Sequence, residues 1–437
     1  MVSLHFFVGE PVLMSSGGDN AVKHWILDQQ EGAPRLLRFR SGHAAPPVIV
    51  QFYGDGKRLL SAGSDRAFRV FSTIQDQQSL ELSQRNVAHR AKKLKVAQQD
   101  LKLAPVTAAA SCQLRERDWC NVVTCHADSD TAYTWRLSQG ALGEHVLTQP
   151  QGGGAAVTAV ALSPCGNYAL LGGDGGHVDR FNLQSGLHRG SYMRSSGDHD
   201  AATAARAQAR RSSKPGKQQQ LWALAGPKRA REAGDLAAHD GTVTFLDVDA
   251  CNTACITAGR DGAIRTWGFK QRSLSGTAHA GAPVERGAFH RGSSLLACAC
   301  GDTVVRVFDV SAFPPRRVRT FSGHGDSVTD LAISTDARWL LTSSLDGALR
   351  VFDLPSGTLL QALRLGDAPV TAFALAPDTA FLATAHRGQR CVFLARSCSA
   401  SEQQQQHAHV NPVDGVPHPS EVHFRAHSTS GVSLTPL

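Results

Sequence analysis

The sequence is poor in aromatic residues and contains no long apolar stretch. Aromatic side chains make up 6% of the 437 residues, and methionine occurs three times. An uninterrupted run of about 18 apolar residues, which a membrane-spanning helix needs, is absent. The first residues, MVSLHFFVGEPVLM, have neither the positively charged segment nor the small-residue cleavage site of a secretory signal. We therefore expect a chain that neither spans a membrane nor enters the secretory route.

The ten cysteines lack the spacing of a metal site. They stand singly or on strand-like segments, and the close pairs Cys251 with Cys255 and Cys298 with Cys300 have no second pair at zinc-site spacing. We expect reduced, mostly buried thiols, no metal and no cofactor, which favours the cytosol or the nucleus.

Small and aliphatic residues are plentiful. Hydrophobic residues make up 42% of the chain and glycine occurs 41 times, which suits many short strands joined by tight turns better than a helical bundle. A closed all-β array can use most of a chain of this length in one unit.

An aromatic residue recurs along the chain, in most cases every 41 to 46 residues. The members are Trp25, Phe71, Trp135, Phe181, Trp267, Phe308, Phe352 and Phe393. An aspartate stands five to seven residues earlier in seven of these eight units, and Arg387 replaces it in the last. This period, with β-rich runs bounded by Gly, Pro and Asp, indicates a β-propeller built of four-stranded blades rather than a helical repeat.

Three units share two further spacings. A histidine precedes the turn aspartate by 22 residues, and a hydroxyl side chain precedes it by four. The sets are His43, Ser61 and Asp65; His239, Thr257 and Asp261, with Trp267; and His324, Thr342 and Asp346. The pattern resembles the WD repeat, in which these side chains form a buried hydrogen-bonded chain that satisfies groups costly to bury. Where Phe71 and Phe352 replace tryptophan, the chain should end at the hydroxyl, because the indole N–H is lost.

A set of Ser, His and Asp also suggests general-base catalysis. The same set occurs in several equivalent units, however, whereas a catalytic constellation is normally assembled once from different elements. We therefore predict structural hydrogen-bond chains and no catalytic residue.

The repeats divide the chain into a propeller and a tail. We expect a WD-repeat β-propeller of seven or eight blades over residues 1–396 and a low-complexity tail or linker over residues 397–437. The first unit, residues 1–40, is either a blade of an eight-bladed ring or part of a preceding propeller. Residues 80–102 form a basic insertion, and residues 193–238, rich in Ala, Arg, Gln and Ser, form an insertion that we expect to be disordered.

The formal net charge of +8 is concentrated in these insertions. Lys92, Lys93 and Lys95 in the first are candidates for contact with RNA or another partner, because clustered cations attract anionic partners. Lys228, Arg229 and Arg231 in the second fit a nuclear import signal, and a merely solvated loop is the alternative.

Several phrases between the repeated motifs are distinctive. Among them are RLLRFRSGHAAP (residues 35–46), RDWCNVVTCH (residues 117–126) and NLQSGLHRGSY (residues 182–192). They resemble the second propeller of the Utp-twenty-one / WD-repeat-protein-thirty-six family. The resemblance implies a non-enzymatic scaffold of the UtpB subcomplex in the small-subunit processome, acting in nucleolar pre-rRNA processing and 18S rRNA maturation. The implied partners are the other WD-repeat subunits of that subcomplex, pre-rRNA and the small nucleolar RNA particle.

A general WD-repeat adaptor, such as a ubiquitin-ligase substrate receptor or a chromatin-associated reader, is the alternative. It fits the propeller equally well but explains none of the distinctive phrases. Members of the resembled family carry another propeller before this region and a helical domain after it, so we expect a part of a longer protein, a fragment or a reduced protein. We expect function to lie in the phrases that do not repeat and in the basic loops, not in the repeated aspartates.

Overall fold

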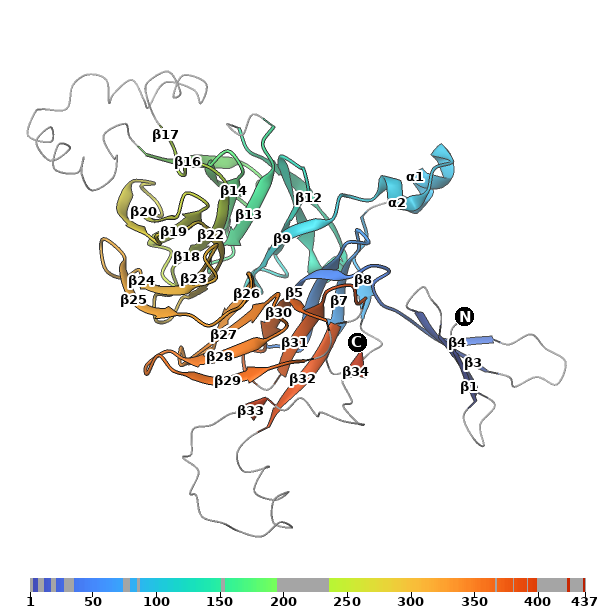
Figure 1. The fold of residues 1–437 in the computed structure, drawn as a ribbon. Coiled ribbons are helices and arrows are strands. Elements are labelled where there is room, and N and C mark those ends of the chain that lie inside the picture. The colour runs from blue at the N-terminus through green and yellow to red at the C-terminus, as the bar shows by residue number, and fades with distance from the viewer. Residues whose placement is uncertain are drawn as a thin grey trace, which may run out of the picture.

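The described part of the chain consists almost entirely of antiparallel sheets. The computed structural model describes residues 3–6, 12–16, 21–26, 35–73, 79–84, 87–150, 154–194, 236–365, 368–379, 381–390, 392–398, 423–424 and 435–436. They form eight sheets, and seven of these are arranged in a ring around a central axis (Figure 1). The prediction of an all-β propeller is confirmed, with seven blades.

Blades 1 to 3 follow one another along the chain. Blade 1 consists of β5 (Pro47–Tyr53), β6 (Arg58–Gly63), β7 (Phe68–Ser72) and β8 (Leu80–Glu81). Blade 2 consists of β9 (Val106–Ser111), β10 (Val122–His126), β11 (Thr131–Arg136) and β12 (Ala141–Thr148), with a 3-10 turn at Leu137–Gln139. Blade 3 consists of β13 (Val157–Leu162), β14 (Tyr168–Gly173), β15 (Val178–Asn182), β16 (His188–Arg194) and β17 (Leu236–Ala237).

Blades 4 to 7 complete the ring. Blade 4 consists of β18 (Val243–Val248), β19 (Ala254–Gly259), β20 (Ala263–Gly268) and β21 (Leu274–His279). Blade 5 consists of β22 (Val284–His290), β23 (Leu295–Cys300), β24 (Val305–Asp309) and β25 (Arg316–Phe321). Blade 6 consists of β26 (Val328–Ile333), β27 (Trp339–Ser344), β28 (Leu349–Asp353) and β29 (Leu359–Leu363). Blade 7 consists of β30 (Val370–Leu375), β31 (Phe381–His386) and β32 (Val392–Cys398), joined by β33 (His423–Phe424) and β34 (Thr435–Pro436).

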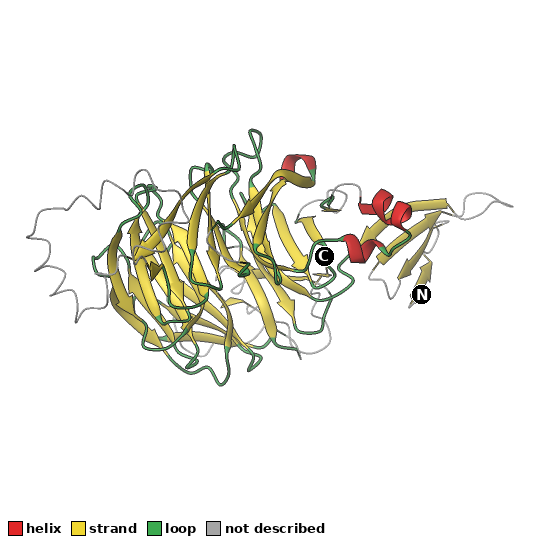
Figure 2. Cartoon of the chain, turned by 90° about the horizontal axis from the view of Figure 1, so that it is seen from above, coloured by secondary structure: helices red, strands yellow, loops and turns green. Residues whose placement is uncertain are grey.

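The first unit forms a sheet of its own outside this ring. Its strands are β1 (Ser3–Phe6), β2 (Val12–Ser16), β3 (Ala21–Ile26) and β4 (Arg35–Ser41). The ring closes without it, because the first strand of blade 7, β30, packs against the first strand of blade 1, β5. Figures 1 and 2 both show the sheet of β1 to β4 beside the ring. The eight-bladed alternative is therefore excluded.

Seven apolar clusters hold the ring together, one at each seam between neighbouring blades. At the seam of blades 1 and 2, for example, the rings of Phe68 and Trp135 meet edge to face with their centroids 5.4 Å apart. The second strand of each blade is buried along almost its whole length, because neighbouring blades cover both of its faces. The core is thus a closed belt of seams rather than a single centre.

The ends of the predicted insertions lie in regular structure. β17 pairs with β16 through Met193 with Ala237 and Arg194 with Leu236. The second insertion therefore begins and ends at the outer edge of the blade 3 sheet. Residues 195–235, including Lys228, Arg229 and Arg231, lie outside the described residues, and the expectation of disorder stays a prediction. The first insertion carries two short helices, α1 (Val87–Leu94) and α2 (Gln98–Leu101).

Two pieces of the predicted tail also lie in the propeller. β33 pairs with β32 at Ser397 and Cys398, and β34 pairs with β32 at Phe393 and Leu394. The outer edge of β32 offers backbone donors and acceptors that an extended segment can satisfy. Parts of the segment expected to be a linker therefore contribute to blade 7. None of the described helices is long and apolar enough to cross a membrane.

Candidate functional site

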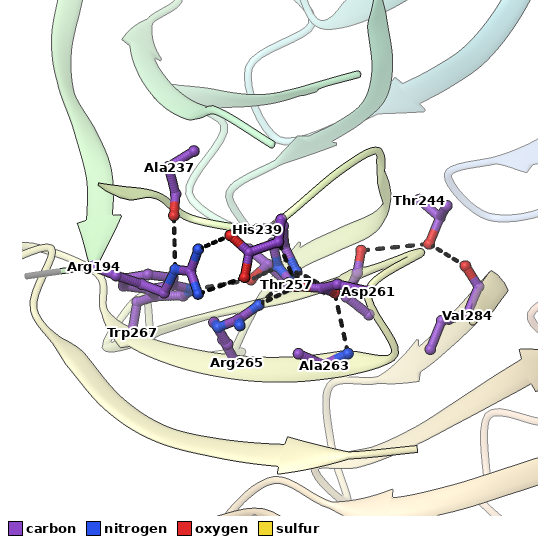
Figure 3. Close-up of polar contacts among 12 residues, drawn as sticks. Arg194, Ala237, His239, Thr244, Thr257, Asp261, Ala263, Arg265, Trp267 and Val284 are labelled. Atoms are coloured by element: carbon purple, nitrogen blue, oxygen red, sulfur yellow. Dashed lines mark hydrogen bonds and ion pairs between the residues drawn. The ribbon is translucent and has the colours of Figure 1, made fainter. Parts of the chain in front are cut away.

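Blade 4 brings all four predicted side chains of one chain together (Figure 3). His239 Nδ1 lies 3.0 Å from Asp261 Oδ1, and His239 Nε2 lies 2.8 Å from Thr257 Oγ1. The indole N–H of Trp267 donates to the same hydroxyl oxygen over 2.9 Å. His239, Thr257 and Trp267 are fully buried, because the loop before β18 folds over the turn between β19 and β20.

With a neutral imidazole protonated at Nδ1, Nδ1–H donates to the Asp261 carboxylate, the Thr257 hydroxyl donates to Nε2, and the indole donates to the hydroxyl oxygen. Arg265 Nη1 also lies 2.8 Å from His239 Nδ1, and the other tautomer would accept that bond and donate from Nε2 to Thr257. Burial lowers the pKa of His239 despite its contact with Asp261. Burial alone would raise the pKa of Asp261, but hydrogen bonds from His239 and Arg265 outweigh it and hold that pKa well below its ordinary value.

An arginine four residues after the turn aspartate joins several of these chains. Arg265 Nη1 lies 2.7 Å from Asp261 Oδ2, and in blade 5 Arg306 makes two bonds, of 2.9 and 2.5 Å, to Asp302. The Asp-x-x-x-Arg spacing is visible in the sequence and could have been found beside the histidine spacing. In blade 1 the equivalent Arg69 bonds to Glu81 over 2.8 Å.

Blade 1 contains the shortened chain that the sequence predicts. His43 Nδ1 lies 3.1 Å from Asp65 Oδ1, and Nε2 lies 2.9 Å from Ser61 Oγ. Phe71 packs edge-on against the imidazole, with the centroids 6.1 Å apart. The aromatic ring keeps its packing role there while its hydrogen bond is lost.

Blade 6 differs from the expected arrangement. Arg350 Nη1 lies 2.8 Å from His324 Nδ1 and 2.8 Å from Asp346 Oδ2, so the arginine connects the two residues that were expected to meet directly. His324 Nδ1 must then accept, and Nε2–H donates to Thr342 Oγ1 over 2.8 Å. Since Phe352 supplies no indole donor, the Thr342 oxygen can accept this bond. Burial, reinforced by the Arg350 charge, lowers the pKa of His324 to about 4.

Blades 2 and 7 contain an imidazole that the sequence reasoning missed. In blade 2, His126 Nε2 lies 2.9 Å from Thr124 Oγ1, Nδ1 lies 2.5 Å from the Ala104 carbonyl, and Trp135 donates to Thr124 over 2.7 Å. Blade 7 repeats the two imidazole contacts with His386, and Phe393 packs edge-on against the imidazole in place of the indole. The signal is a Thr-x-His at the end of the second strand, in TCH and TAH.

In blades 1 and 4, a glycine on the second strand makes room for the loop imidazole. His126 and Gly259 occupy equivalent register positions, each opposite the first residue of the blade's inner strand. A Cβ atom on Gly259 would lie 2.8 Å from His239 Nδ1, and one on Gly63 would lie 2.7 Å from His43 Nδ1. The imidazole therefore fills the same space in both layouts. In blade 4 it comes from the loop before the inner strand, and in blade 2 it comes from the end of the second strand.

Threonines connect neighbouring blades near the axis. Five of the seven inner strands begin with Val-Thr. In three of them the hydroxyl donates to the carbonyl of the first residue of the next blade: Thr158 to Val243 over 2.6 Å, Thr244 to Val284 over 2.8 Å and Thr329 to Val370 over 2.8 Å. Each of these threonines is the extra residue of a β-bulge, which turns its side chain out of the ladder.

The axis of the ring contains an open cavity of about 560 Å³, lined by all seven inner strands. At its wall, Arg291 Nη2 lies 2.6 Å from Asp247 Oδ1 and 2.9 Å from the Leu162 carbonyl, so one guanidinium joins blades 3, 4 and 5. Burial raises the pKa of Asp330 to about 6, and this carboxylate accepts the N–H of Phe373 from blade 7 over 3.0 Å.

The distinctive phrases also form contacts between blades. In RDWCNVVTCH, the indole of Trp119 donates to the Gly166 carbonyl of blade 3, and Asn121 Nδ2 donates to the Tyr53 hydroxyl of blade 1 over 2.6 Å. In NLQSGLHRGSY, the Tyr192 hydroxyl donates to the Phe269 carbonyl of blade 4 over 3.0 Å. Part of what makes these phrases unlike the repeats is therefore their role in joining blades.

The three lysines of the first insertion are exposed. Lys92 and Lys93 lie in the last turn of α1, and Lys95 follows it; the helix projects from the ring between blades 1 and 2 (Figure 1). Its base is fixed by Gln84, which donates to the Arg66 carbonyl over 2.9 Å and accepts the Leu103 N–H over 2.8 Å. The three lysines thus lie outside the propeller, on an insertion whose base is fixed to blade 1 by hydrogen bonds.

No cluster of three or more His, Cys, Asp or Glu side chains suited to a metal ion occurs among the described residues. The histidines and aspartates predicted from spacing form hydrogen bonds with one another in blades 1 and 4, and are connected through Arg350 in blade 6. The arrangement satisfies buried polar groups and fixes each loop to its turn.

Comparison with known proteins identifies the type of propeller. A family model described as the WDR36/Utp21 second beta-propeller domain matches residues 48–209 and 217–419. The chain belongs to the WDR36/Utp21 family. The resemblance seen in the sequence is confirmed.

Relatives of this WDR36/Utp21 chain come from fungi and animals. It is 36% identical over 387 residues to the U3 small nucleolar RNA-associated protein 21 homolog of Schizosaccharomyces pombe, covering 88% of this chain and 38% of the relative. It is 32% identical over 399 residues to the human WD repeat-containing protein 36, covering 90% of this chain and 40% of the relative. The chain thus spans about two fifths of the length of these relatives.

Proposed function

We propose that this chain acts as a non-enzymatic scaffold subunit of the small-subunit processome, in nucleolar pre-rRNA processing and 18S rRNA maturation. The observation that carries the proposal is the match to the WDR36/Utp21 second propeller over most of the chain, together with relatives named as U3 small nucleolar RNA-associated proteins. The chain spans about two fifths of the length of those relatives. We therefore propose partner binding for this propeller, and the role in pre-rRNA processing for the whole protein to which it belongs.

The physical case for a scaffold rests on the closed ring. Seven apolar seams, the threonine bonds between blades and the buried imidazole chains all join parts of the propeller to one another. Such a body offers a fixed set of loops and edges on which other proteins can be positioned. The proposed partners are other WD-repeat subunits of the UtpB subcomplex, pre-rRNA and the small nucleolar RNA particle.

Sedimentation tests this proposal. The tagged protein should sediment with large pre-ribosomal particles and co-purify with U3 RNA, and its depletion should reduce 18S rRNA. If it stays in light fractions and pre-rRNA processing is unchanged, the scaffold proposal is wrong, and a general WD-repeat adaptor is the better description.

We further propose that Lys92, Lys93 and Lys95 contact pre-rRNA. The three side chains are exposed on one anchored excursion, and phosphate contacts by lysine release counterions and make binding salt-dependent. The triple alanine variant should crosslink less to pre-rRNA and show a shallower salt dependence. A triple alanine variant of the exposed Arg189, Lys270 and Arg364, on blades 3, 4 and 6, is the charge-matched control. Equal crosslinking by the Lys92, Lys93 and Lys95 variant and the wild type would remove these lysines from the RNA contact.

Nuclear entry is proposed to depend on Lys228, Arg229 and Arg231, a basic group typical of import signals. Replacing the three by alanine should leave the tagged protein in the cytoplasm. Unchanged nuclear accumulation would indicate that these residues form a merely solvated segment.

A further inference from the structure

We propose that the outer edge of blade 5 binds an extended acidic segment of another protein, which adds to the sheet as a further strand. The proposal concerns β25, residues 316–321, and the residue Phe313 just before it. It does not depend on the role in pre-rRNA processing.

β25 is an edge strand with most of its side chains in solvent. It is the last strand of its sheet in the described residues, and five of its six residues are exposed, with Phe321 as the buried anchor. A strand at a sheet edge presents unpaired backbone N–H and C=O groups, which are a template for another extended chain. Peptides use this mode of recognition by adding a strand through main-chain hydrogen bonds.

The edge carries positive charge and no acidic residue. Arg316 and Arg317 are exposed. Asp309 lies opposite Arg316 in the strand pairing; its Oδ1 accepts the Ser311 N–H over 2.9 Å and the Ser311 hydroxyl over 2.6 Å, and its single negative charge leaves the edge with a net positive charge. A strand that carries glutamate or aspartate would find cross-strand partners here, since opposite charges on adjacent strands attract each other.

A third arginine holds this edge in place. Arg319 Nη2 donates to the Pro355 carbonyl over 2.6 Å, and its Nε donates to the Leu354 carbonyl over 3.3 Å. Both acceptors belong to the turn after β28 in blade 6. β25 is thereby fastened to the next blade, so a partner would meet a preformed edge and less conformational entropy would be lost on binding.

Apolar side chains lie among the charges. Val318 is 45% exposed and Phe313 is 61% exposed. Arg316 and Arg317 are consecutive and face opposite sides of the sheet. Together with the exposed phenylalanine and valine, they fit a segment that carries acidic and apolar residues on both of its faces. β29, the corresponding strand of blade 6, exposes Leu359 and Leu360 without a charged residue, and so lacks the charge that selects an acidic partner.

The arginines could instead keep the edge unpaired, since charged residues on edge strands commonly prevent association. The two roles differ in outcome. Protective arginines repel or fail to bind every added strand, whereas recognition arginines bind an acidic one.

Peptide binding distinguishes these roles. The probe is a fluorescein-labelled peptide of about six residues, the usual strand length, with the sequence Glu-Glu-Val-Val-Glu-Glu, which places glutamate on both faces; it is titrated with the full chain and followed by anisotropy. One control peptide has lysine in place of glutamate, and a second has N-methylated valines, which lack the N–H groups needed for strand addition. The protein variants are Arg316→Glu with Arg317→Glu, and the matched control Arg189→Glu with Lys270→Glu.

The acidic peptide should bind the wild type and the control variant alike, and should bind the Arg316→Glu, Arg317→Glu variant about tenfold or more weakly. The lysine and N-methylated peptides should not bind. Equal binding of the N-methylated peptide would mean a purely electrostatic contact and overturn strand addition. Equal binding by the Arg316→Glu, Arg317→Glu variant, concentration-dependent dimers of the protein, or competition by an RNA oligomer would each overturn the assignment to an acidic protein segment.

Discussion

At the scale of single residues, the Asp261 carboxylate accepts most of the polar contacts that fix the loop of blade 4 to its turn. It receives His239 Nδ1 over 3.0 Å, Arg265 Nη1 over 2.7 Å and the backbone N–H of Ala263 over 3.1 Å. Removing the carboxylate leaves the buried Arg265 guanidinium without its counter-charge, with His239 Nδ1 2.8 Å from Nη1 as its remaining neighbour. Breaking one side of a buried charged network costs more than the network contributes net.

Asp261→Ala should therefore lower the free energy of unfolding by about 3 kcal/mol. The matched control is Asp302→Ala in blade 5, where the aspartate side chain is 38% exposed and pairs with Arg306; a loss of about 1 kcal/mol or less is expected there. Urea unfolding of both variants at neutral pH measures the difference. Equal losses would mean that the imidazole chain contributes nothing beyond an ordinary ion pair.

The sequence predicted these residues only where their spacing is regular. His43, His239 and His324 stand 22 residues before an aspartate, and such a fixed offset is readable without a structure. His126 and His386 reach the equivalent space from a different backbone position, so no offset shared with the other blades reveals them. One partner of each is a backbone carbonyl, which has no residue identity. The other is a threonine two residues earlier, so the trace that they leave in the sequence is the short Thr-x-His.

At the scale of strands, the bulge at the start of an inner strand turns a threonine toward the next blade. Thr244 donates to the Val284 carbonyl over 2.8 Å (Figure 3), whereas Thr371, at the same place in blade 7, donates within its own blade, to Ala385 over 3.2 Å. The two threonines have the same local sequence, Val-Thr. Thr244 also reaches the Ala258 carbonyl of its own blade, over 3.4 Å, so the two threonines differ in the added bond to the next blade.

Thr244→Val should lower the free energy of unfolding by about 1 kcal/mol, because it leaves the shape almost unchanged and removes one hydrogen-bond donor from a buried carbonyl. Thr244→Ser should recover most of the loss. Thr371→Val serves as the control for a threonine that does not join two blades. If the valine variant of Thr244 unfolds at the wild-type urea midpoint, the bond between blades is of no consequence for stability.

At the scale of the whole molecule, the ring closes through blade 7. The seam of blades 7 and 1 has its own apolar cluster, and β33 and β34 add to the outer edge of β32. The number of blades could not be predicted from the sequence, because the first unit has the same aromatic and aspartate spacing as the others. Closure is decided by contacts between the two ends of the ring, which no local pattern contains.

Removing residues 423–437 should therefore expose the edge of β32. The thermal midpoint should fall by several degrees, about what a loss of 1 to 2 kcal/mol produces, and the shortened protein should associate at high concentration through its free edge. Calorimetry and light scattering measure the two effects. A monomer with an unchanged midpoint would show that the two short strands do not stabilise blade 7.

The shared space around Gly259 and His126 restricts how one blade could change into the other. Gly259→His alone would place a second imidazole against that of His239, and His239→Ala alone would leave Thr257 and Asp261 without their imidazole. Only the two changes together reproduce the layout of blade 2. In a double-mutant cycle, each single variant should have a lower free energy of unfolding than the wild type, and the double variant should recover part of the loss. A change from one layout to the other would therefore pass through a less stable single variant, whichever substitution came first.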